Sequence, residues 1–207
     1  MISYLLILLN LFLPMQKKEI NYLALGDSYT IGESVSEQGR WPNQLADQLK
    51  IPRPKIIATT GWRTDDLSNA IKAAKLKDEY DMVSLLIGVN NQYQGKSSAL
   101  YEIEFEELLK TSIKLAKGKT KNVFVVSIPD YGFTPYGKPK QESITKQIDE
   151  FNSINKRITK KYKITYISIT EISRKGLEDP TLVAEDGLHP SGKMYTLWVE
   201  LIRKALK

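Results

Sequence analysis

From residue 17 onward, short apolar runs alternate with longer stretches in which apolar residues recur every three or four positions. The short runs are typical of buried strands, and the longer spacing is typical of amphipathic helices. This alternation predicts an α/β fold in which crossover helices cover a parallel sheet. We expect strands at Ile20–Leu25, Lys55–Thr59, Met82–Ile87, Asn122–Ile128 and Ile164–Ile167, and helices at 41–50, 65–76, 100–117, 142–162 and 191–206.

No internal repeat, low-complexity stretch or linker divides residues 17–207, so we expect them to form one domain. The first sixteen residues contain no charged side chain. They are too few for a membrane-spanning helix of about 20 residues, and their apolar run resembles the core of a secretory signal. We therefore predict that residues 1–16 are a signal peptide or an N-terminal membrane anchor.

This prediction places the protein outside the cytoplasm, as a periplasmic, secreted or membrane-tethered protein. Two alternatives stay open. Residues 1–16 would otherwise form a buried N-terminal helix, or the true start would be Met15 and the protein would be cytoplasmic.

The composition removes several kinds of chemistry. The 207 residues include 30 Lys plus Arg, 24 Asp plus Glu, a single His and no Cys, with a formal net charge of +6. A net charge this small does not indicate a nucleic-acid partner. The absence of Cys excludes disulfides, thiolate nucleophiles and Cys-based metal sites, and a single His excludes multi-His metal sites. We expect neither a metal ion nor a cofactor.

The single histidine lies in the most informative loop of the sequence. Asp186 precedes His189 by three residues, and Pro190 follows it. At this one-turn spacing an aspartate can accept a hydrogen bond from one imidazole nitrogen and leave the other free as a general base. The alternative is a surface or helix-capping histidine, but this context favours the base.

A histidine base needs a nucleophile, and without Cys the candidates are Ser and Thr hydroxyls. Ser28 follows the first expected strand, and chemistry in parallel sheets gathers at the carboxyl ends of strands. In the next two strand-end loops, Gly61 offers a backbone N–H and Asn90 a side-chain amide to a developing oxyanion, with the Ser28 N–H as a third donor. Each residue alone is also a common turn or helix-cap residue.

Taken together, these loops resemble the sequence blocks of the SGNH (GDSL-type) hydrolase family. The blocks occur in the family's order, namely Gly26-Asp27-Ser28, a glycine block at Gly61, Gly88-Val89-Asn90-Asn91 and Asp186-Gly187-Leu188-His189. The resemblance spans roughly residues 20–206 and implies a three-layer α/β/α sandwich of flavodoxin-like type. The implied sheet has five parallel strands in the order 2-1-3-4-5.

The resemblance also implies a role for each residue. Ser28 is the implied nucleophile, Asp186 the orienting acid and His189 the base, with Ser28, Gly61 and Asn90 forming the oxyanion hole. The sequence departs from the family pattern at Asn91, where many relatives have Asp, and in the Tyr-Thr pair that follows Ser28. Neither departure removes a catalytic group.

We therefore predict a metal-independent serine hydrolase that cleaves carboxylic esters or thioesters through an acyl-enzyme. The alternatives are a noncatalytic ligand-binding protein and a flavodoxin-like cofactor binder on the same fold. The substrate is expected to be a small-molecule ester, and an acyl ester, a lysophospholipid and an acetylated sugar all remain open. An association with the membrane would be through residues 1–16.

The loop between the expected strand at Asn122–Ile128 and the expected helix at 142–162 is rich in Gly, Pro and Tyr. Gly132–Lys138 has the glycine spacing of a phosphate-binding loop, but Pro139 replaces the hydroxyl residue that would bind Mg²⁺. Pro135 and Pro139 also lack the N–H groups that a phosphate cradle uses. We expect this loop to lie over the active-site edge, where Tyr131, Phe133 and Tyr136 would line an acyl or sugar pocket.

Overall fold

The computed structural model describes residues 19–207. The predicted signal peptide or anchor at residues 1–16 lies outside the described residues. Among the helices of residues 19–207, none combines the length and the apolar character that crossing a membrane requires.

The sheet has the predicted topology. All strand pairs are parallel, and the strand order is β2-β1-β3-β4-β5. The interior strand at Tyr22–Gly26 is buried along its whole length because helices cover both of its faces. The strands are β1 (Tyr22–Gly26), β2 (Lys55–Ala58), β3 (Met82–Leu86), β4 (Val123–Val126) and β5 (Thr165–Ile167).

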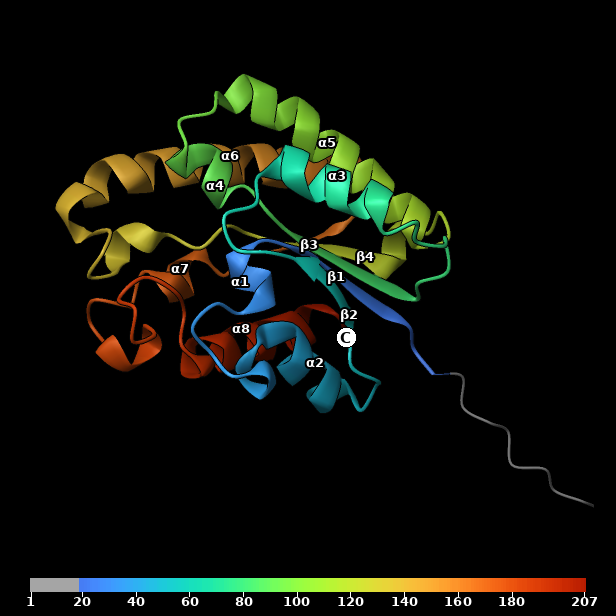
Figure 1. The fold of residues 1–207 in the computed structure, drawn as a ribbon, viewed down its shortest axis with the longest axis horizontal. Coiled ribbons are helices and arrows are strands. Elements are labelled where there is room, and N and C mark those ends of the chain that lie inside the picture. Colours follow the sequence, from blue (N-terminus) through green and yellow to red (C-terminus); the bar gives the residue numbers. More distant parts are fainter. Residues whose placement is uncertain (1–18) are drawn as a thin grey trace, which may run out of the picture.

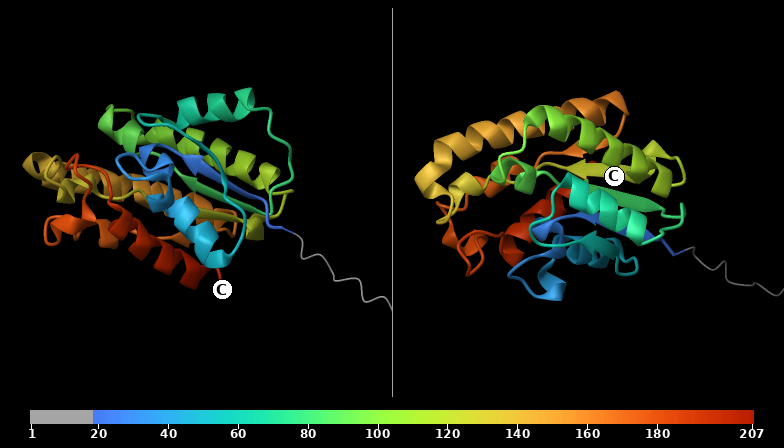
Figure 2. Two further views of the ribbon diagram at one scale, coloured as in Figure 1. Left: turned by 60° about the horizontal axis from the view of Figure 1, so that its bottom comes forward. Right: turned by 45° about the horizontal axis from the view of Figure 1, so that its top comes forward.

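Two layers of helices enclose the sheet (Figures 1 and 2). On one face α3 packs against α5 and α5 against α6, and on the other face α2 packs against α8. The predicted three-layer α/β/α sandwich is therefore confirmed. The helices are α2 (Trp41–Leu49), α3 (Thr64–Ala73), α5 (Ser98–Leu115), α6 (Gln141–Lys161) and α8 (Gly192–Ala205).

The helices follow the predicted apolar periodicity. In α6, Ile144, Ile148, Phe151 and Ile158 are buried, while the intervening Lys146 and Glu150 are exposed. These spacings of three, four and seven residues keep one side of the helix on the sheet. Such packing fixes the position of each strand relative to the helices, and therefore also fixes the loops at the strand ends.

Three short helices lie close to the carboxyl ends of strands. They are α1 (Ser28–Ile31), α4 (Val89–Tyr93) and α7 (Thr170–Ser173). The sequence analysis did not predict them, because four or five residues are too few to show a helical period. Two of the three carry predicted site residues.

Candidate active site

Ser28 is the first residue of α1, directly beyond the end of β1. The turn between them requires glycine at position 26, since a Cβ there would lie 2.1 Å from Thr30 Oγ1 and 2.5 Å from the Leu86 carbonyl oxygen. Asp27 caps the helix by accepting a hydrogen bond of 3.0 Å from the Tyr29 N–H. Ser28 is only 4% exposed, so a rigid turn holds its hydroxyl in place.

His189 and Asp186 make the contact that their spacing predicts. The imidazole Nδ1 lies 2.6 Å from Asp186 Oδ2, and Asp186 Oδ1 accepts the backbone N–H groups of Leu188 and His189, each at 2.9 Å. The Tyr29 ring packs edge-on against the imidazole with the centroids 5.8 Å apart. The imidazole is thereby fixed in orientation, with Nε2 as the nitrogen opposite the aspartate.

Ser34 is a further partner of the aspartate that the sequence analysis missed. Its hydroxyl donates to Asp186 Oδ2 at 2.6 Å, the same oxygen that faces His189. Burial acts to raise the pKa of Asp186, but the hydrogen bonds from Ser34, His189 and the backbone outweigh it and hold that pKa well below its usual range. The carboxylate therefore stays charged beside the imidazole. No motif marks Ser34, whose position depends on a left-handed backbone with φ of 63°.

Asp27, next to the predicted nucleophile, has a raised pKa, whereas the pKa of Asp186 is lowered. Its side chain is fully buried, and Oδ2 has no hydrogen-bond partner among the described residues. Burial raises its pKa to about 7, despite hydrogen bonds from the backbone N–H groups of Tyr29, Asp27 itself and Gly88. One of the two aspartates near the site is therefore strongly acidic, and the other holds its proton up to neutral pH.

Gly61 and Asn90 meet at the ends of β2 and β3. Gly61 has φ of +84°, a backbone conformation that side chains disfavour, and a Cβ there would meet no atom within 4 Å. Asn90 Nδ2 donates to the Trp62 carbonyl at 2.9 Å, which orients its amide beside the glycine. Gln94 Nε2 donates to the Gly61 carbonyl at 3.3 Å, so α4 also holds the glycine loop.

Asn91 has a different environment from its neighbour. It is 1% exposed, its Oδ1 accepts the Thr64 N–H at 3.1 Å, and its Nδ2 donates to Thr64 Oγ1 at 2.6 Å. These bonds join α4 to the start of α3. The residue that departs from the family pattern thus has a structural role away from the cleft.

Four of the five predicted site residues line one cleft of about 200 Å³, and they come from loops far apart in the sequence. They are Ser28, Gly61, Asn90 and His189. Asp186 is bonded to His189 and does not line the cleft. The carboxyl ends of the strands therefore bring together the groups that acyl transfer requires.

Tyrosines close one end of this cleft. The hydroxyls of Tyr93 and Tyr136 are 2.6 Å apart, and the rings of Tyr93 and Tyr131 have centroids 6.2 Å apart. The Tyr136 N–H donates to the Gly187 carbonyl at 3.0 Å, which ties the aromatic loop to the loop that contains His189. Beyond the tyrosines lies a second groove of about 530 Å³, lined by polar residues such as Gln92, Lys140, Ser143 and Gln147.

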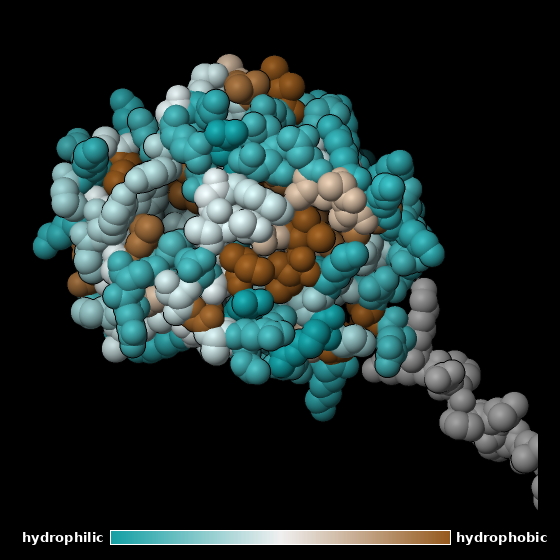
Figure 3. All heavy atoms as spheres, in the orientation of Figure 1, coloured by the Kyte–Doolittle hydropathy of each residue, from teal (hydrophilic) through white to brown (hydrophobic). Residues whose placement is uncertain are grey.

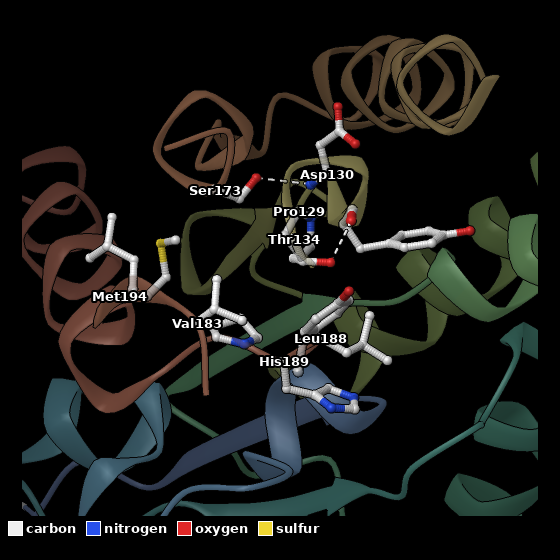
Figure 4. Close-up of a pocket in the computed structure, with 12 residues that line it drawn as sticks. Pro129, Asp130, Thr134, Ser173, Val183, Leu188, His189 and Met194 are labelled. Carbon is white, nitrogen blue, oxygen red and sulfur yellow. Dashed lines mark hydrogen bonds between the residues drawn. The ribbon is translucent and has the colours of Figure 1, made fainter. Parts of the chain in front are cut away.

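A smaller cavity lies on another side of His189 (Figure 4). Its lining includes Pro129, Thr134 and Met194, and its volume of about 20 Å³ is room for roughly one water molecule. An acyl group does not fit there. The cleft in front of Ser28 is therefore the space available to a substrate.

In the loop with the glycine spacing of a phosphate cradle, the glycine N–H groups form hydrogen bonds to neighbouring residues of the chain. The Gly132 N–H donates to Asp130 and the Gly137 N–H to Thr134 Oγ1, so neither amide points to a ligand. Within residues 19–207 no group of three His, Cys, Asp or Glu side chains is placed to hold a metal ion.

Comparisons with known proteins give a family and a fold. A sequence model of the GDSL-like lipase/acylhydrolase family matches residues 24–197, which is most of the chain. A search of curated protein sequences gives no significant match.

Several solved structures share the fold. TesA superimposes with a TM-score of 0.71 at 16% identity, over 90% of this chain and 98% of that one. The acetylxylan esterase Axe2 from Geobacillus stearothermophilus gives 0.69 at 18% identity, over 90% and 94% of the two chains. The psychrotrophic esterase EstA from Pseudoalteromonas sp. gives 0.66 at 17% identity, over 91% and 97%. At these identities the likeness shows the fold alone.

Proposed function

Because the chain belongs to the GDSL-like lipase/acylhydrolase family and is an ester-hydrolysing enzyme, we propose that it cleaves carboxylic esters through an acyl-enzyme on Ser28. One observation carries the proposal. The hydroxyl of Ser28 and an imidazole oriented by a charged carboxylate share a single cleft with Gly61 and Asn90, which we propose as oxyanion donors. The family assignment favours this function over a noncatalytic binding protein or a flavodoxin-like cofactor binder.

The proposed reaction begins with proton transfer from Ser28 to His189 Nε2 while the serine oxygen attacks the ester carbonyl. The negative charge on the carbonyl oxygen is stabilised by the N–H groups of Ser28 and Gly61 and by the Asn90 amide. Asp186 stabilises the imidazolium, which then gives its proton to the departing alcohol. His189 then takes a proton from a water molecule, which attacks the acyl-enzyme, and returns that proton to the Ser28 oxygen as the bond to the acyl group breaks and the carboxylic acid leaves. This cycle uses neither a metal ion nor a cofactor.

The size of the cleft supports short acyl groups. A cavity of about 150 Å³ holds a single benzene molecule, and the cleft in front of Ser28 measures about 200 Å³. The Tyr93–Tyr136 contact separates this space from the larger groove beyond. We therefore favour esters of short acyl chains, acetylated sugars among them, over long-chain lysophospholipids.

A fluorophosphonate probe tests the nucleophile. The probe is expected to label the wild-type protein on Ser28 and to inactivate it. Ser28→Ala should lose the label and at least about 10³-fold in kcat for a p-nitrophenyl ester, with an unchanged melting temperature, because removing one hydroxyl costs little packing. Ser153→Ala, on the exposed side of α6, is the matched control and should be labelled normally. Labelling of the Ser28→Ala protein would show that another residue is the nucleophile.

A further inference from the structure

Basic side chains gather at the end of the molecule opposite the cleft. Because all strands are parallel, every segment that leads from a helix into a strand lies at the amino ends of the strands. The segments at this amino-end face contain 15 Lys or Arg and five Asp or Glu, whereas the whole chain has a net charge of only +6. They are residues 19–21, 47–55, 75–81, 114–121, 160–163 and 203–207. The remainder of the chain is therefore net negative.

The backbone conformation of several lysines is a second, independent observation that this face favours positive charge. Among residues 19–207, five non-glycine residues have a left-handed backbone, and four of them are lysines on this face, just past helix ends. They are Lys50, Lys75, Lys117 and Lys163, with φ between 45° and 62°. Glycine is the usual residue there, because a Cβ opposes the left-handed conformation. At four positions the chain thus carries a cation where the local backbone favours glycine.

Helix dipoles account for only part of this pattern. A cation stabilises the last turn of a helix, as Lys114 does in α5. The effect fades beyond that turn, and Lys77, Lys119 and Lys121 are exposed side chains of the loops before β3 and β4. These loop lysines extend the positive charge across the face.

The chain enters the fold on this same face. Asn21 is bound there, since its N–H donates to Asp81 Oδ2 at 3.2 Å and its carbonyl accepts the Asp81 N–H at 2.8 Å. The sequence just before the described residues continues the pattern, with Lys17 and Lys18 preceded by sixteen residues that have no charged side chain. Figure 3 shows hydrophilic residues at the edge of the molecule where the described chain begins.

We propose that the amino-end face docks on an anionic lipid bilayer. Juxtamembrane lysines are attracted to anionic headgroups within about a Debye length, roughly 10 Å, and an adjacent apolar segment adds hydrophobic affinity. In this orientation the Ser28 cleft, at the opposite ends of the strands, faces away from the membrane. The docked enzyme therefore acts on esters in the surrounding solution.

Vesicle sedimentation of the full chain tests the proposal. Vesicles of phosphatidylcholine with about one third phosphatidylglycerol should bind at least about 100-fold more tightly than phosphatidylcholine alone at low salt, and high salt should remove the difference. The variant Lys50→Gly/Lys75→Gly/Lys163→Gly removes three charges at positions where glycine fits the backbone, so it should fold normally. Its affinity for the anionic vesicles should fall roughly 100-fold, with binding to phosphatidylcholine unchanged.

The matched control removes the same charge from the opposite end of the molecule, as Lys96→Gln/Lys138→Gln/Lys146→Gln. It should bind anionic vesicles within about threefold of wild type, since those lysines lie beyond a Debye length from the docked bilayer. Equal loss in both variants would overturn the proposal, as would wild-type binding by the glycine variant. Tighter binding to duplex DNA than to anionic vesicles at the same salt would overturn the assignment to lipid.

Discussion

Asn90 and Asn91 are adjacent in sequence, but their side chains have different partners. The Asn90 amide lies in the cleft beside the Trp62 carbonyl, whereas the Asn91 amide is buried against Thr64. If Asn90 donates to charge that exists only in the transition state, Asn90→Ala should lower kcat by roughly 10²- to 10³-fold with KM little changed. Steady-state kinetics with a p-nitrophenyl ester measures both parameters.

Asn91→Ala is the matched control for that prediction. It leaves the buried Thr64 N–H without its partner, so we expect a loss of about 1–3 kcal/mol in unfolding free energy. Its kcat should change much less than that of Asn90→Ala at a temperature where the protein stays folded. A larger loss of kcat in Asn91→Ala, with both proteins melting like wild type, would mean that Asn91 and not Asn90 is the oxyanion donor.

Asp27 predicts a pH dependence of stability. Its pKa of about 7 in the folded protein lies above the ordinary carboxyl value of 3.8. A folded state that holds a proton longer than the unfolded state loses stability as pH rises between those two values, by up to roughly 4 kcal/mol. Asp27→Asn has no such titration and keeps an acceptor for the Tyr29 N–H. The variant should therefore gain stability relative to wild type between pH 4 and pH 8.

Urea unfolding at both ends of this pH range measures the difference. Glu150→Gln, which removes an exposed carboxylate on α6, is the control and should differ from wild type equally at both pH values. A difference between Asp27→Asn and wild type that does not grow with pH would show that Asp27 is already ionised in the folded protein at pH 4.

Individual site residues differed in how far sequence could predict them. The Asp186 to His189 contact is local, so a three-residue spacing was enough to predict it. Ser34 reaches the same carboxylate from 152 positions away, and such a contact depends on packing that no local pattern records. The buried state of Asp27 escaped prediction for the same reason. The catalytic roles of the five residues stay predictions until their variants are assayed.

At the level of elements, periodicity predicted each long helix to within three residues at either end. The expected helix at 65–76 is α3 at Thr64–Ala73, and the expected helix at 142–162 is α6 at Gln141–Lys161. The short helix α4 was not predicted, although it carries Asn90. Its first turn is set by Gly88, where φ is +131° and a Cβ would lie 2.5 Å from the Tyr101 hydroxyl, and that contact is tertiary.

The aromatic end of the cleft leads to a prediction about acyl-chain length. Tyr136→Ala removes one ring of the pair that separates the cleft from the adjoining groove. The ratio of kcat/KM for a decanoyl ester to that for a butyryl ester should then rise about tenfold or more, since each methylene placed in apolar space gains about 0.8 kcal/mol. A series of p-nitrophenyl esters gives the ratio.

Tyr136→Phe separates the ring from its hydroxyl. It removes only the hydrogen bond to Tyr93, so the ratio should change less than in Tyr136→Ala. Both side chains are about half exposed, at 56% for Tyr93 and 51% for Tyr136, and truncation should therefore cost little stability. An unchanged ratio in Tyr136→Ala would mean that the tyrosine pair does not limit the acyl chain.

At the scale of the whole molecule, the alternation of strands and helices predicted a parallel sheet with crossover helices, and the family resemblance supplied the three-layer sandwich and the strand order. The uneven distribution of charge was beyond prediction from the net charge of +6, because it requires knowing which loops share an end of the sheet. Parallel topology places the cleft at one end and the lysine-rich loops at the other. The same connectivity thus separates the proposed chemistry from the proposed docking surface.

The domain is expected to fold without residues 1–16. Every helix and strand of the described chain lies between Tyr22 and Ala205, and the core is built from these elements. A protein lacking residues 1–16 should therefore melt within about 2–4 °C of the full chain, a shift that corresponds to no more than about 1 kcal/mol. Its kcat on a soluble ester should also be unchanged. Calorimetry of both proteins in detergent-free buffer makes the comparison, and a melting temperature lower by 10 °C or so would mean that residues 1–16 pack against the domain.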